Sequence, residues 1–365
     1  MESNIRILVC PLNWGLGHAS RVVPVIQELI KKEYSVIIAA DGNALEFLKN
    51  EFPRLKTIRF KSYNINYSKK NSQVFKMALL IPQLVNWTVR EHFLLKKIVR
   101  DEKIDVVISD NRYGLWNKKT YTVFITHQLN ILFPWILSVF EPVTRQIVKL
   151  IVKKYDECWV PDYEESFNLS GKLSHLSKKY SNRYFIGPLS RFAFYANNDG
   201  IKKYDVLFIL SGPEPQRTIL ENIFIQSVHG KELKVALVRG VNLKFQDIRE
   251  NRVSFFGMLN TPGLYELIQR SELVICRSGY SSVMDLVSLN KKAVLIPTPG
   301  QTEQEYLAKY LSDSGLFFYM KQNEFSVEKA IDNAFPAPLI VNGSSKTDLI
   351  QRIDFLEKIL KKKNC

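Results

Sequence analysis

The chain has 365 residues, of which 46% are hydrophobic and 24% charged, and its formal net charge is +15 at pH 7. This composition excludes a disordered or collagen-like chain, and the length predicts two domains. No apolar run approaches the ~18 residues of a membrane-spanning helix, and the cysteines lack metal-ligand spacing, so we expect reduced thiols and a cytoplasmic protein.

Short β-branched runs alternate with helix-like segments, the pattern of parallel α/β folds. A linker rich in turn residues, 186–203, divides two such series. We predict two Rossmann-like, doubly wound domains, 1–188 and 189–343, facing each other across a cleft, followed by an amphipathic helix over 344–365. The predicted strands are 5–10, 35–40, 56–60, 104–109, 122–126 and 157–160 in the first domain, and 205–210, 234–238, 253–256, 273–276 and 293–296 in the second.

The loop after the first strand contains Gly15, Gly17 and His18 ahead of a helix-like segment. Gly15-x-Gly17-x-x-Ser20 nearly matches a dinucleotide-binding fingerprint, and Asp41 follows at the end of the second strand, so a nicotinamide-dependent oxidoreductase is one alternative. A histidine is unusual in that fingerprint. His18 suits a general base that deprotonates a hydroxyl near neutral pH, although a capping or packing histidine would fit the same position.

Two polar residues follow the fourth and fifth predicted strands. Asp110 comes after 104–109 and His127 after 122–126, so we expect both at the same sheet edge as His18. Asp110 would orient His18, act as the base itself or cap a turn. His127 is expected to contact the acceptor rather than to transfer a proton.

Two strand-to-helix loops in the second half are dense in polar groups. In 273–286, Ser281 and its neighbour can cap a helix whose first N–H groups would accept a phosphate, and Asp285 can accept hydrogen bonds from a ribose. In 296–308, Glu303 and Gln304 are either ligand contacts or solvated residues at a helix start.

These loops resemble a known family. CRSGYSSVMDL followed by IPTPGQTEQEYLA is similar to the nucleotide-sugar signature of glycosyltransferase family 28, and WGLGHASR is similar to its GGxGGH loop. THQLN, SGPEPQR and GPLSR resemble its HEQN segment, its Gly/Ser-rich loop ending in Arg and its GNPxR linker, in the same order along the chain. The chain departs from the family pattern at Pro213, Pro215, Asp285 and the pair Glu303-Gln304.

The resemblance implies a GT-B glycosyltransferase that transfers a sugar from a nucleotide-sugar donor, UDP-linked, to a hydroxyl by metal-independent direct displacement. No DxD motif occurs, and no metal or other cofactor is expected. On the acceptor side the resemblance implies His18 in the motif's histidine position, with Gly15, Gly17, His127 and Asn130 near the acceptor. Together with Asp110, which its place after a strand suggests, His18 is a predicted catalytic residue. On the donor side it implies that Asp285 binds the ribose and that Ser278, Gly279 and Ser281 contact the diphosphate. Glu303 and Gln304 would then bind the sugar, and Phe256 to Met258 would contact the base. Arg217 and Arg277 would offset the diphosphate charge, with a structural salt bridge as the alternative for Arg277.

Most of the excess positive charge lies in residues 1–190, which favours an anionic partner. No nucleic-acid-binding motif is apparent, so we expect no nucleic acid. Segments 74–100 and 131–155 mix apolar and aromatic residues with basic ones, which predicts peripheral binding to the inner face of a membrane and a lipid or lipid-linked acceptor. Core helices with solvated basic edges are the alternative. A sugar-nucleotide 2-epimerase on the same fold is the second alternative function.

Overall fold

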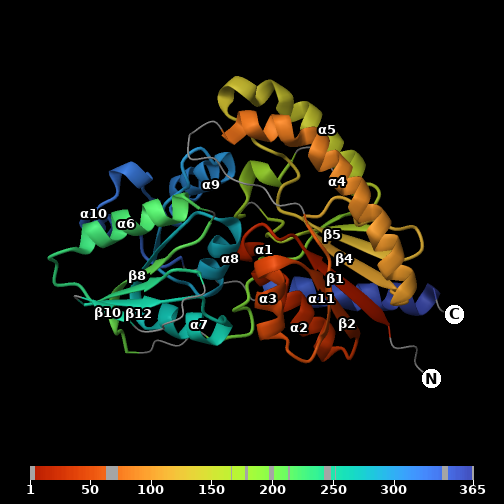
Figure 1. The fold of residues 1–365 in the computed structure, drawn as a ribbon, viewed down its shortest axis with the longest axis horizontal. Coiled ribbons are helices and arrows are strands. Elements are labelled where there is room, and N and C mark those ends of the chain that lie inside the picture. Colours follow the sequence, from red (N-terminus) through yellow and green to blue (C-terminus); the bar gives the residue numbers. More distant parts are fainter. Residues whose placement is uncertain are drawn as a thin grey trace. The chain divides into compact units, whose positions relative to one another are not determined.

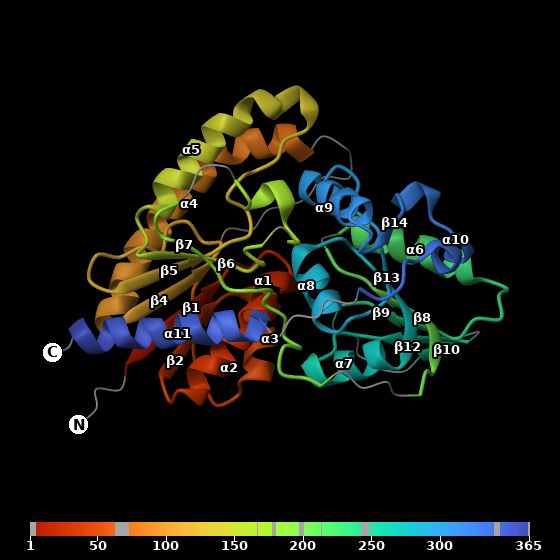
Figure 2. The same cartoon turned by 180° about the vertical axis from the view of Figure 1, so that it is seen from behind.

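The computed structural model describes residues 5–62, 73–165, 167–176, 180–196, 201–212, 214–241, 248–250, 252–338 and 344–363. These residues form two compact α/β units, each built around one sheet (Figures 1 and 2). Unit 1 holds the described residues of Met1–Ile65, Val74–Ala193 and Asn342–Cys365, and unit 2 holds those of Phe194–Val341. The division thus falls a few residues after the predicted boundary at 188, and the terminal helix is part of unit 1.

The sheet of unit 1 is parallel throughout, in the order β3-β2-β1-β4-β5-β6-β7. Its central strands are buried along nearly their whole length, as expected for strands covered on both faces. The predicted strands are all present, whereas β7 was not predicted because it is short and only half-buried. The strands are β1 (Arg6–Pro11), β2 (Ser35–Ala40), β3 (Lys56–Arg59), β4 (Val106–Asp110), β5 (Tyr121–Ile125), β6 (Glu157–Val160) and β7 (Arg183–Phe185).

Two helices pack side by side along the same face of this sheet. Leu95 and Val99 on one helix pack against β1, β2 and β4, while Val148 and Val152 on another pack against β5 and β6. The helices are α1 (Leu16–Arg21), α2 (Val23–Lys31), α3 (Gly42–Glu51), α4 (Gln73–Asp101), α5 (Glu141–Val152) and α11 (Ser344–Lys363), with short 3-10 turns η1 (Trp135–Phe140) and η2 (Gly171–Leu173).

The terminal helix α11 docks on unit 1 through an apolar stripe and one buried ion pair. Leu349, Ile353, Leu356 and Leu360 are buried at the spacing of one helix face. Arg352 Nε donates to Glu157 Oε2 at 2.7 Å, and the Glu157 carboxylate also accepts from Tyr121 and Trp159. The amphipathic pattern of the sequence therefore reports a real packing face.

Unit 2 contains a second sheet in the order β10-β11-β9-β8-β12-β13-β14, parallel except for β10. Its strands are β8 (Tyr204–Ile209), β9 (Val235–Val238), β10 (Ile248–Glu250), β11 (Val253–Phe256), β12 (Ser271–Cys276), β13 (Ala293–Leu295) and β14 (Phe318–Tyr319). Its helices are α6 (Gln216–Val228), α7 (Thr261–Gln269), α8 (Tyr280–Ser288), α9 (Thr302–Asp313) and α10 (Val327–Asn333), with the turn η3 (Gln322–Glu324).

Each sheet reverses its strand order once, and that reversal marks the expected ligand edge. In unit 1 the chain builds outward from β1 and then returns to add β4 on the other side of it. In unit 2 the same happens between β8 and β12. Ligands of such sheets bind beyond the carboxyl ends of the strands at this switch point. The ends of β1 and β4, and those of β8 and β12, are therefore the places to examine.

Candidate active site

The carboxyl edge of unit 1 brings His18 and Asp110 together. Asp110 is the last residue of β4 and pairs in register with Pro11 at the end of β1. Gly15 adopts φ 74°, a conformation that glycine tolerates, and α1 begins directly after it. This turn places His18 on α1 beside β4, with its Nδ1 3.2 Å from Asp110 Oδ2.

Arg21, one helical turn after His18, lies at the centre of the same cluster. Its Nε is 2.9 Å from Asp110 Oδ1 and 2.8 Å from Asp110 Oδ2, and its Nη2 also contacts Asp110 Oδ1. Nη2 lies 2.9 Å from His18 Nδ1, and Nη1 lies 2.8 Å from His127 Nδ1. One guanidinium thus joins three residues from α1, β4 and the loop after β5.

These contacts fix the proton position on His127 and leave two arrangements for His18. His127 Nδ1 accepts from Arg21, so His127 carries its proton on Nε2. His18 Nδ1 either accepts from Arg21 or donates to Asp110, and only donation to Asp110 leaves Nε2 able to take up a proton.

The electrostatics of the cluster favour a neutral His18 and an ionised Asp110. Burial lowers the pKa of His18, and the charge of Arg21 lowers it further, against the opposing effect of Asp110. Burial by itself would raise the pKa of Asp110, but Arg21 and His18 outweigh it and hold that pKa below its ordinary value. A neutral imidazole beside a carboxylate is the state that a general base requires.

Two predicted residues at this edge have partners within unit 1. Asp110 is fully buried and both its carboxylate oxygens are engaged, one of them with His18, which fits the expectation that it orients His18 better than that it acts as the base. Asn130 is also buried, where its amide donates to the Lys172 carbonyl and accepts from Arg145. It therefore ties the segment leading to α5 to its neighbours within unit 1.

In a dinucleotide-binding site Asp41 would have to bind a ribose, but it already has a protein partner. Asp41 Oδ1 accepts from Arg59 Nε at 3.0 Å, an ion pair across β2 and β3. A ribose would have to displace that contact. Gly17 is occupied as well, because its carbonyl accepts from the Ser20 hydroxyl at 3.0 Å.

The carboxyl edge of unit 2 places the second set of predicted residues around the start of α8. Gly279 is the N-cap of α8, and a Cβ added there would meet no atom within 4 Å. Ser281 lies half-buried in the first turn, and Asp285 is buried further along the same helix. Glu303 lies half-buried in the first turn of α9, and Phe256 and Met258 are half-buried at the end of β11.

Arg277 has a different role from the predicted offset of diphosphate charge. Its guanidinium is buried, and it donates to the carbonyls of Pro297 at 3.1 Å and Gln216 at 3.0 Å and to Gln322 Oε1 at 2.7 Å. Burial lowers the pKa of Arg277 to about 10. Because these partners come from the start of α6, the loop after β13 and the turn η3, Arg277 ties three neighbouring segments of this edge to the end of β12. No salt bridge to it is formed among the described residues.

Ser278, Gln304 and Arg217 also face protein partners. The Ser278 hydroxyl donates to the Gln304 carbonyl at 2.8 Å, and Gln304 Oε1 accepts from the Thr298 amide at 2.9 Å. The Ser278 hydroxyl and the Gln304 side-chain oxygen are therefore both engaged within unit 2, around the loop before α9. Arg217 is paired with two carboxylates, Glu214 and Glu221, so a phosphate would compete with them for its charge.

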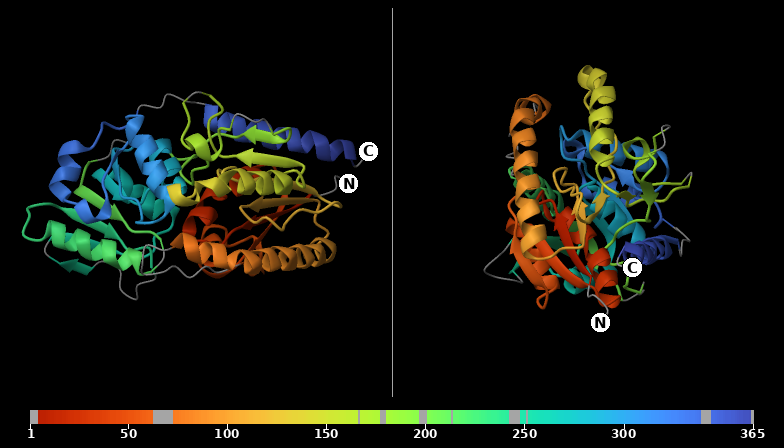
Figure 3. Two further views of the ribbon diagram at one scale, coloured as in Figure 1. Left: turned by 90° about the horizontal axis from the view of Figure 1, so that it is seen from above. Right: turned by 90° about the vertical axis from the view of Figure 1, so that its right-hand side faces the viewer.

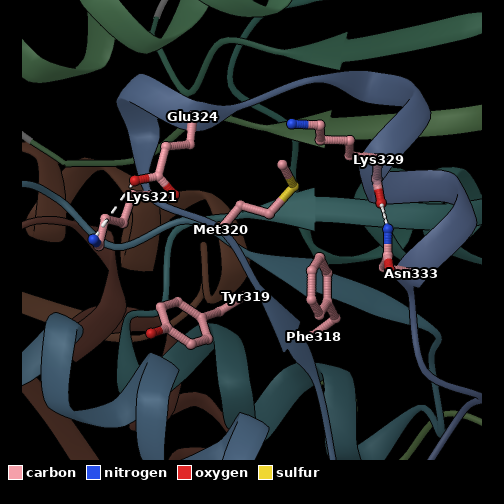
Figure 4. Close-up of a pocket in the computed structure, with 7 residues that line it drawn as sticks. All are labelled: Phe318, Tyr319, Met320, Lys321, Glu324, Lys329 and Asn333. Carbon is pink, nitrogen blue, oxygen red and sulfur yellow. Dashed lines mark hydrogen bonds and ion pairs between the residues drawn. The ribbon is translucent and has the colours of Figure 1, made fainter.

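A pocket of about 350 Å³ lies on unit 2 beside β14, η3 and α10 (Figure 4). Its lining includes Phe318, Met320 and Lys329, while Lys321 pairs with Glu324 across 3.6 Å. It contains none of the predicted donor residues, and we assign it no function.

Comparison with known proteins decides between the alternative functions. Residues 207–351 match the model of the Glycosyltransferase family 28 C-terminal domain, and residues 5–132 match that of Glycosyl transferase family 1. The chain is a GT-B glycosyltransferase with a family 28 C-terminal domain. The oxidoreductase and epimerase alternatives are therefore set aside, and the resemblance seen in the sequence is confirmed.

Relatives and solved structures match this glycosyltransferase over most of its length. An uncharacterized glycosyltransferase of Methanosarcina mazei is 22% identical over 85% of this chain and 84% of its own. A UDP-N-acetylglucosamine–N-acetylmuramyl-(pentapeptide) pyrophosphoryl-undecaprenol N-acetylglucosamine transferase of a Sulfurihydrogenibium species is 27% identical over 87% of both chains. The crystal structure of the glycotransferase of kitacinnamycin superimposes with a TM-score of 0.64, at 13% identity over 98% of both chains, which shows the fold.

Sequence reasoning missed Arg21 as a functional candidate. It belongs to the same WGLGHASR loop as His18, and its position one turn later on a predicted helix was visible. The available signal was the i, i+3 spacing, which puts both side chains on one helix face. What it binds on β4 and after β5 could not be read from that spacing.

Proposed function

We propose that this glycosyltransferase transfers a sugar from a UDP-linked donor to a hydroxyl of a lipid or lipid-linked acceptor, at an anionic membrane surface and without a metal ion. The observation that carries the acceptor half of this proposal is a pair of exposed apolar stripes on unit 1. The Sulfurihydrogenibium relative, whose name gives a UDP-sugar and an undecaprenol-linked acceptor, supports both halves.

The proposed step is a direct displacement at the anomeric carbon. The acceptor oxygen forms a bond to that carbon while the bond from the carbon to the diphosphate oxygen breaks. The electron pair leaves with the diphosphate, and the acceptor proton passes to Nε2 of His18. Asp110 Oδ2, 3.2 Å from Nδ1, stabilises the imidazolium that forms.

The donor is proposed to bind at the edge of unit 2. The first-turn N–H groups of α8 and the open space at Gly279 suit a diphosphate, and Asp285 is proposed to bind the ribose. Among the described residues no group of three His, Cys, Asp or Glu side chains is placed to hold a metal ion. In this proposal helix dipoles stabilise the leaving group in place of a metal.

Two stripes of apolar side chains are exposed on α4 and on the η1–α5 segment. On α5, Val143, Ile147 and Leu150 recur at i, i+4 and i+7, so they share one helix face, while Val148 and Val152 are buried on the other. Phe93 is 63% exposed and Val139 is 72% exposed. The α4 stripe consists of Val85, Val89, Phe93 and Leu94, and the α5 stripe of Val139, Phe140, Val143, Ile147 and Leu150.

The two helices extend from the sheet of unit 1 in the same direction, as separate columns (Figure 3, right). Exposed basic residues accompany the stripes: Arg90, Lys96, Lys97 and Arg100 on α4, and Lys153 and Lys154 after α5. No helix in the described part of the chain is both long and apolar enough to cross a membrane. Apolar faces flanked by lysine and arginine suit shallow insertion among anionic headgroups. Lys76, Leu79 to Ile81, Trp135 and Ile136 were also predicted to belong to this surface. The structure describes the backbone of these residues but not their side chains.

Sedimentation with vesicles tests the membrane half. We expect binding to anionic vesicles at low salt, weaker binding at high salt and weaker binding to neutral vesicles, since each basic residue contributes ~1 kcal/mol that salt screens. The double variant Val143→Ser/Ile147→Ser should lose most of the binding. Ile201→Ser, which removes an apolar residue of unit 2 that is 93% exposed, should bind like the parent chain. Negligible binding to both vesicle types at low salt would contradict the proposal and favour a soluble acceptor.

Thermal stabilisation by a panel of UDP- and GDP-sugars tests the donor half. We expect one or more UDP-sugars to raise the melting temperature, and the effect to persist in excess EDTA. Stabilisation by GDP-sugars alone, or its loss in EDTA, would overturn the UDP or the metal-free part respectively.

A further inference from the structure

Arg21 is nearly fully buried, and its three donor nitrogens all point at side chains of the proposed acceptor edge. Nε and Nη2 contact the Asp110 carboxylate, Nη2 also contacts His18 Nδ1, and Nη1 contacts His127 Nδ1. Arg277, the buried arginine of unit 2, donates to backbone carbonyls. The partners of Arg21 are instead two histidines and an aspartate.

The planar fork of a guanidinium is what allows one side chain to reach all three partners. A lysine ammonium would carry the same charge but would lack the fixed directions of Nη1 and Nη2. The charge and the shape of Arg21 therefore have separable consequences. The charge acts on the protonation of His18, while the shape holds Asp110 and His127 in place.

We propose that Arg21 is a positioning residue that orients Asp110 and His127 around His18 and keeps the His18 imidazole neutral, ready to accept a proton. This inference rests on the proposed role of His18 as the base. The charged and titratable groups that act on His18 are Arg21 on α1, Asp110 on β4 and His127 after β5. Asp110 favours the imidazolium and Arg21 opposes it, so Arg21 sets a limit on how strongly the carboxylate can make His18 hold a proton.

Nuclear magnetic resonance of labelled histidine rings measures this effect without any substrate. The chain has five histidines, and the His18 signals are assigned by their absence in His18→Asn. We expect the pKa of His18 to rise in Arg21→Met, because a neighbouring positive charge is removed, and to stay near the parent value in Arg21→Lys. An unchanged or lower pKa in Arg21→Met would overturn the proposal.

Arg112→Met is the matched control. Arg112 is a second nearly fully buried arginine of unit 1, and it pairs with the carboxylate of Glu91 at 2.8 Å, so its loss also removes a buried charge pair. The groups that shift the pKa of His18 are Arg21, Asp110 and His127, and Arg112 is not one of them. We expect this variant to lose stability without moving the His18 pKa. A shift equal to that in Arg21→Met would mean that general loosening, and not the Arg21 charge, is being measured.

The pH profile of the transfer rate separates charge from shape. Arg21→Met should move the acidic limb of kcat/KM to higher pH, because more of His18 is then protonated at a given pH. Arg21→Lys should leave the limb in place but lower the plateau, on the order of 10²-fold, because Asp110 and His127 are no longer held. Equal lowering at every pH in both variants would reduce Arg21 to a structural residue.

Failure of the inference is distinguishable from failure of the proposed function. If His18→Asn keeps a near-normal rate, or if the ring nitrogens of His18 show the proton on Nε2, the base assignment is wrong. Suppose instead that His18→Asn abolishes transfer and that the His18 proton is on Nδ1. If the pKa of His18 is then unchanged in Arg21→Met, only the inference about Arg21 is wrong.

Discussion

Two arginines, Arg21 at the end of α1 in unit 1 and Arg277 directly after β12 in unit 2, are each 1% exposed. Both lie beyond the carboxyl ends of central strands at a switch in strand order. Arg21 binds the side chains of Asp110, His18 and His127. Arg277 binds the main-chain carbonyls of the surrounding loops and one glutamine side chain. The same residue, equally buried, thus acts on protonation in one unit and on loop position in the other.

The difference shows how a buried cation is accommodated in two ways. In unit 1 the charge of Arg21 is compensated by the Asp110 carboxylate, and both charges act on the neighbouring His18 imidazole. In unit 2 the charge of Arg277 is compensated by carbonyl dipoles, which carry no net charge. Burial accordingly lowers the pKa of Arg277 to about 10, whereas Asp110 stays ionised beside Arg21. A family motif that contains an arginine therefore does not by itself say whether that arginine faces a ligand.

The largest effect is expected at the proton acceptor. His18→Ala should lower the transfer rate ~10²–10⁴-fold at saturating substrates, the usual cost of losing a general base, while calorimetry with UDP shows unchanged affinity. His229→Ala, which removes an exposed histidine from unit 2, is the control and should be silent. Near-normal turnover in His18→Ala would show that His18 is not the general base, and the proposed role of Arg21 would fall with it.

The second largest effect is expected on unit 2. Arg277→Met leaves the Pro297 and Gln216 carbonyls and Gln322 without their donor, and each such loss costs about 1–3 kcal/mol when the group stays buried. We expect a lower free energy of unfolding and weaker UDP binding, with His18 signals unchanged. Arg270→Met breaks only an exposed i, i+4 pair and should change little. Normal stability with weak UDP binding would restore Arg277 as a direct donor contact.

A smaller effect is expected at the proposed ribose contact. Asp285→Ala should weaken UDP binding about 10- to 150-fold, the equivalent of roughly 1.5–3 kcal/mol for hydrogen bonds to a charged acceptor. Isothermal titration calorimetry measures it, and Asp285→Asn should retain part of the affinity. If Asp285 only stabilises α8, the melting temperature will fall while UDP binds as before.

The smallest effect is expected in the pH dependence of stability. Because the folded pKa of His18 lies below its unfolded value of ~6.5, protons bind preferentially to the unfolded chain below that pH. The free energy of unfolding should fall as the pH drops from about 6.5 toward the folded pKa, and His18→Asn should flatten the curve there. The lowered pKa of Asp110 adds a loss below about pH 3.9 in both proteins. Urea denaturation at a series of pH values measures both, and parallel curves would contradict the buried, neutral His18.

Much of the fold could be predicted from local sequence. Runs such as ILVC before Pro11 and VVIS before Asp110 are long enough and apolar enough to be central parallel strands, and they are. Helical spacing of Leu349 to Leu360 predicted a packed terminal helix, and those residues are buried. Strand β7 was missed because its three residues carry no buried pattern, and its pairing comes only from β6. The spacing of apolar residues shows which face of a helix or strand is buried, but it does not show that a short strand lies at the edge of a sheet.

The candidate site divides along the same line. The sequence by itself determined which loops end at the ligand edges, because parallel strands point their carboxyl ends the same way and the motifs follow those ends. Only the tertiary structure decided what each polar side chain binds there. Arg21 meets Asp110 across 89 residues and His127 across 106, and Arg277 meets Gln322 across 45. Hydrogen bonds are directional and short, so partners that far apart along the chain are set by how the strands and loops pack.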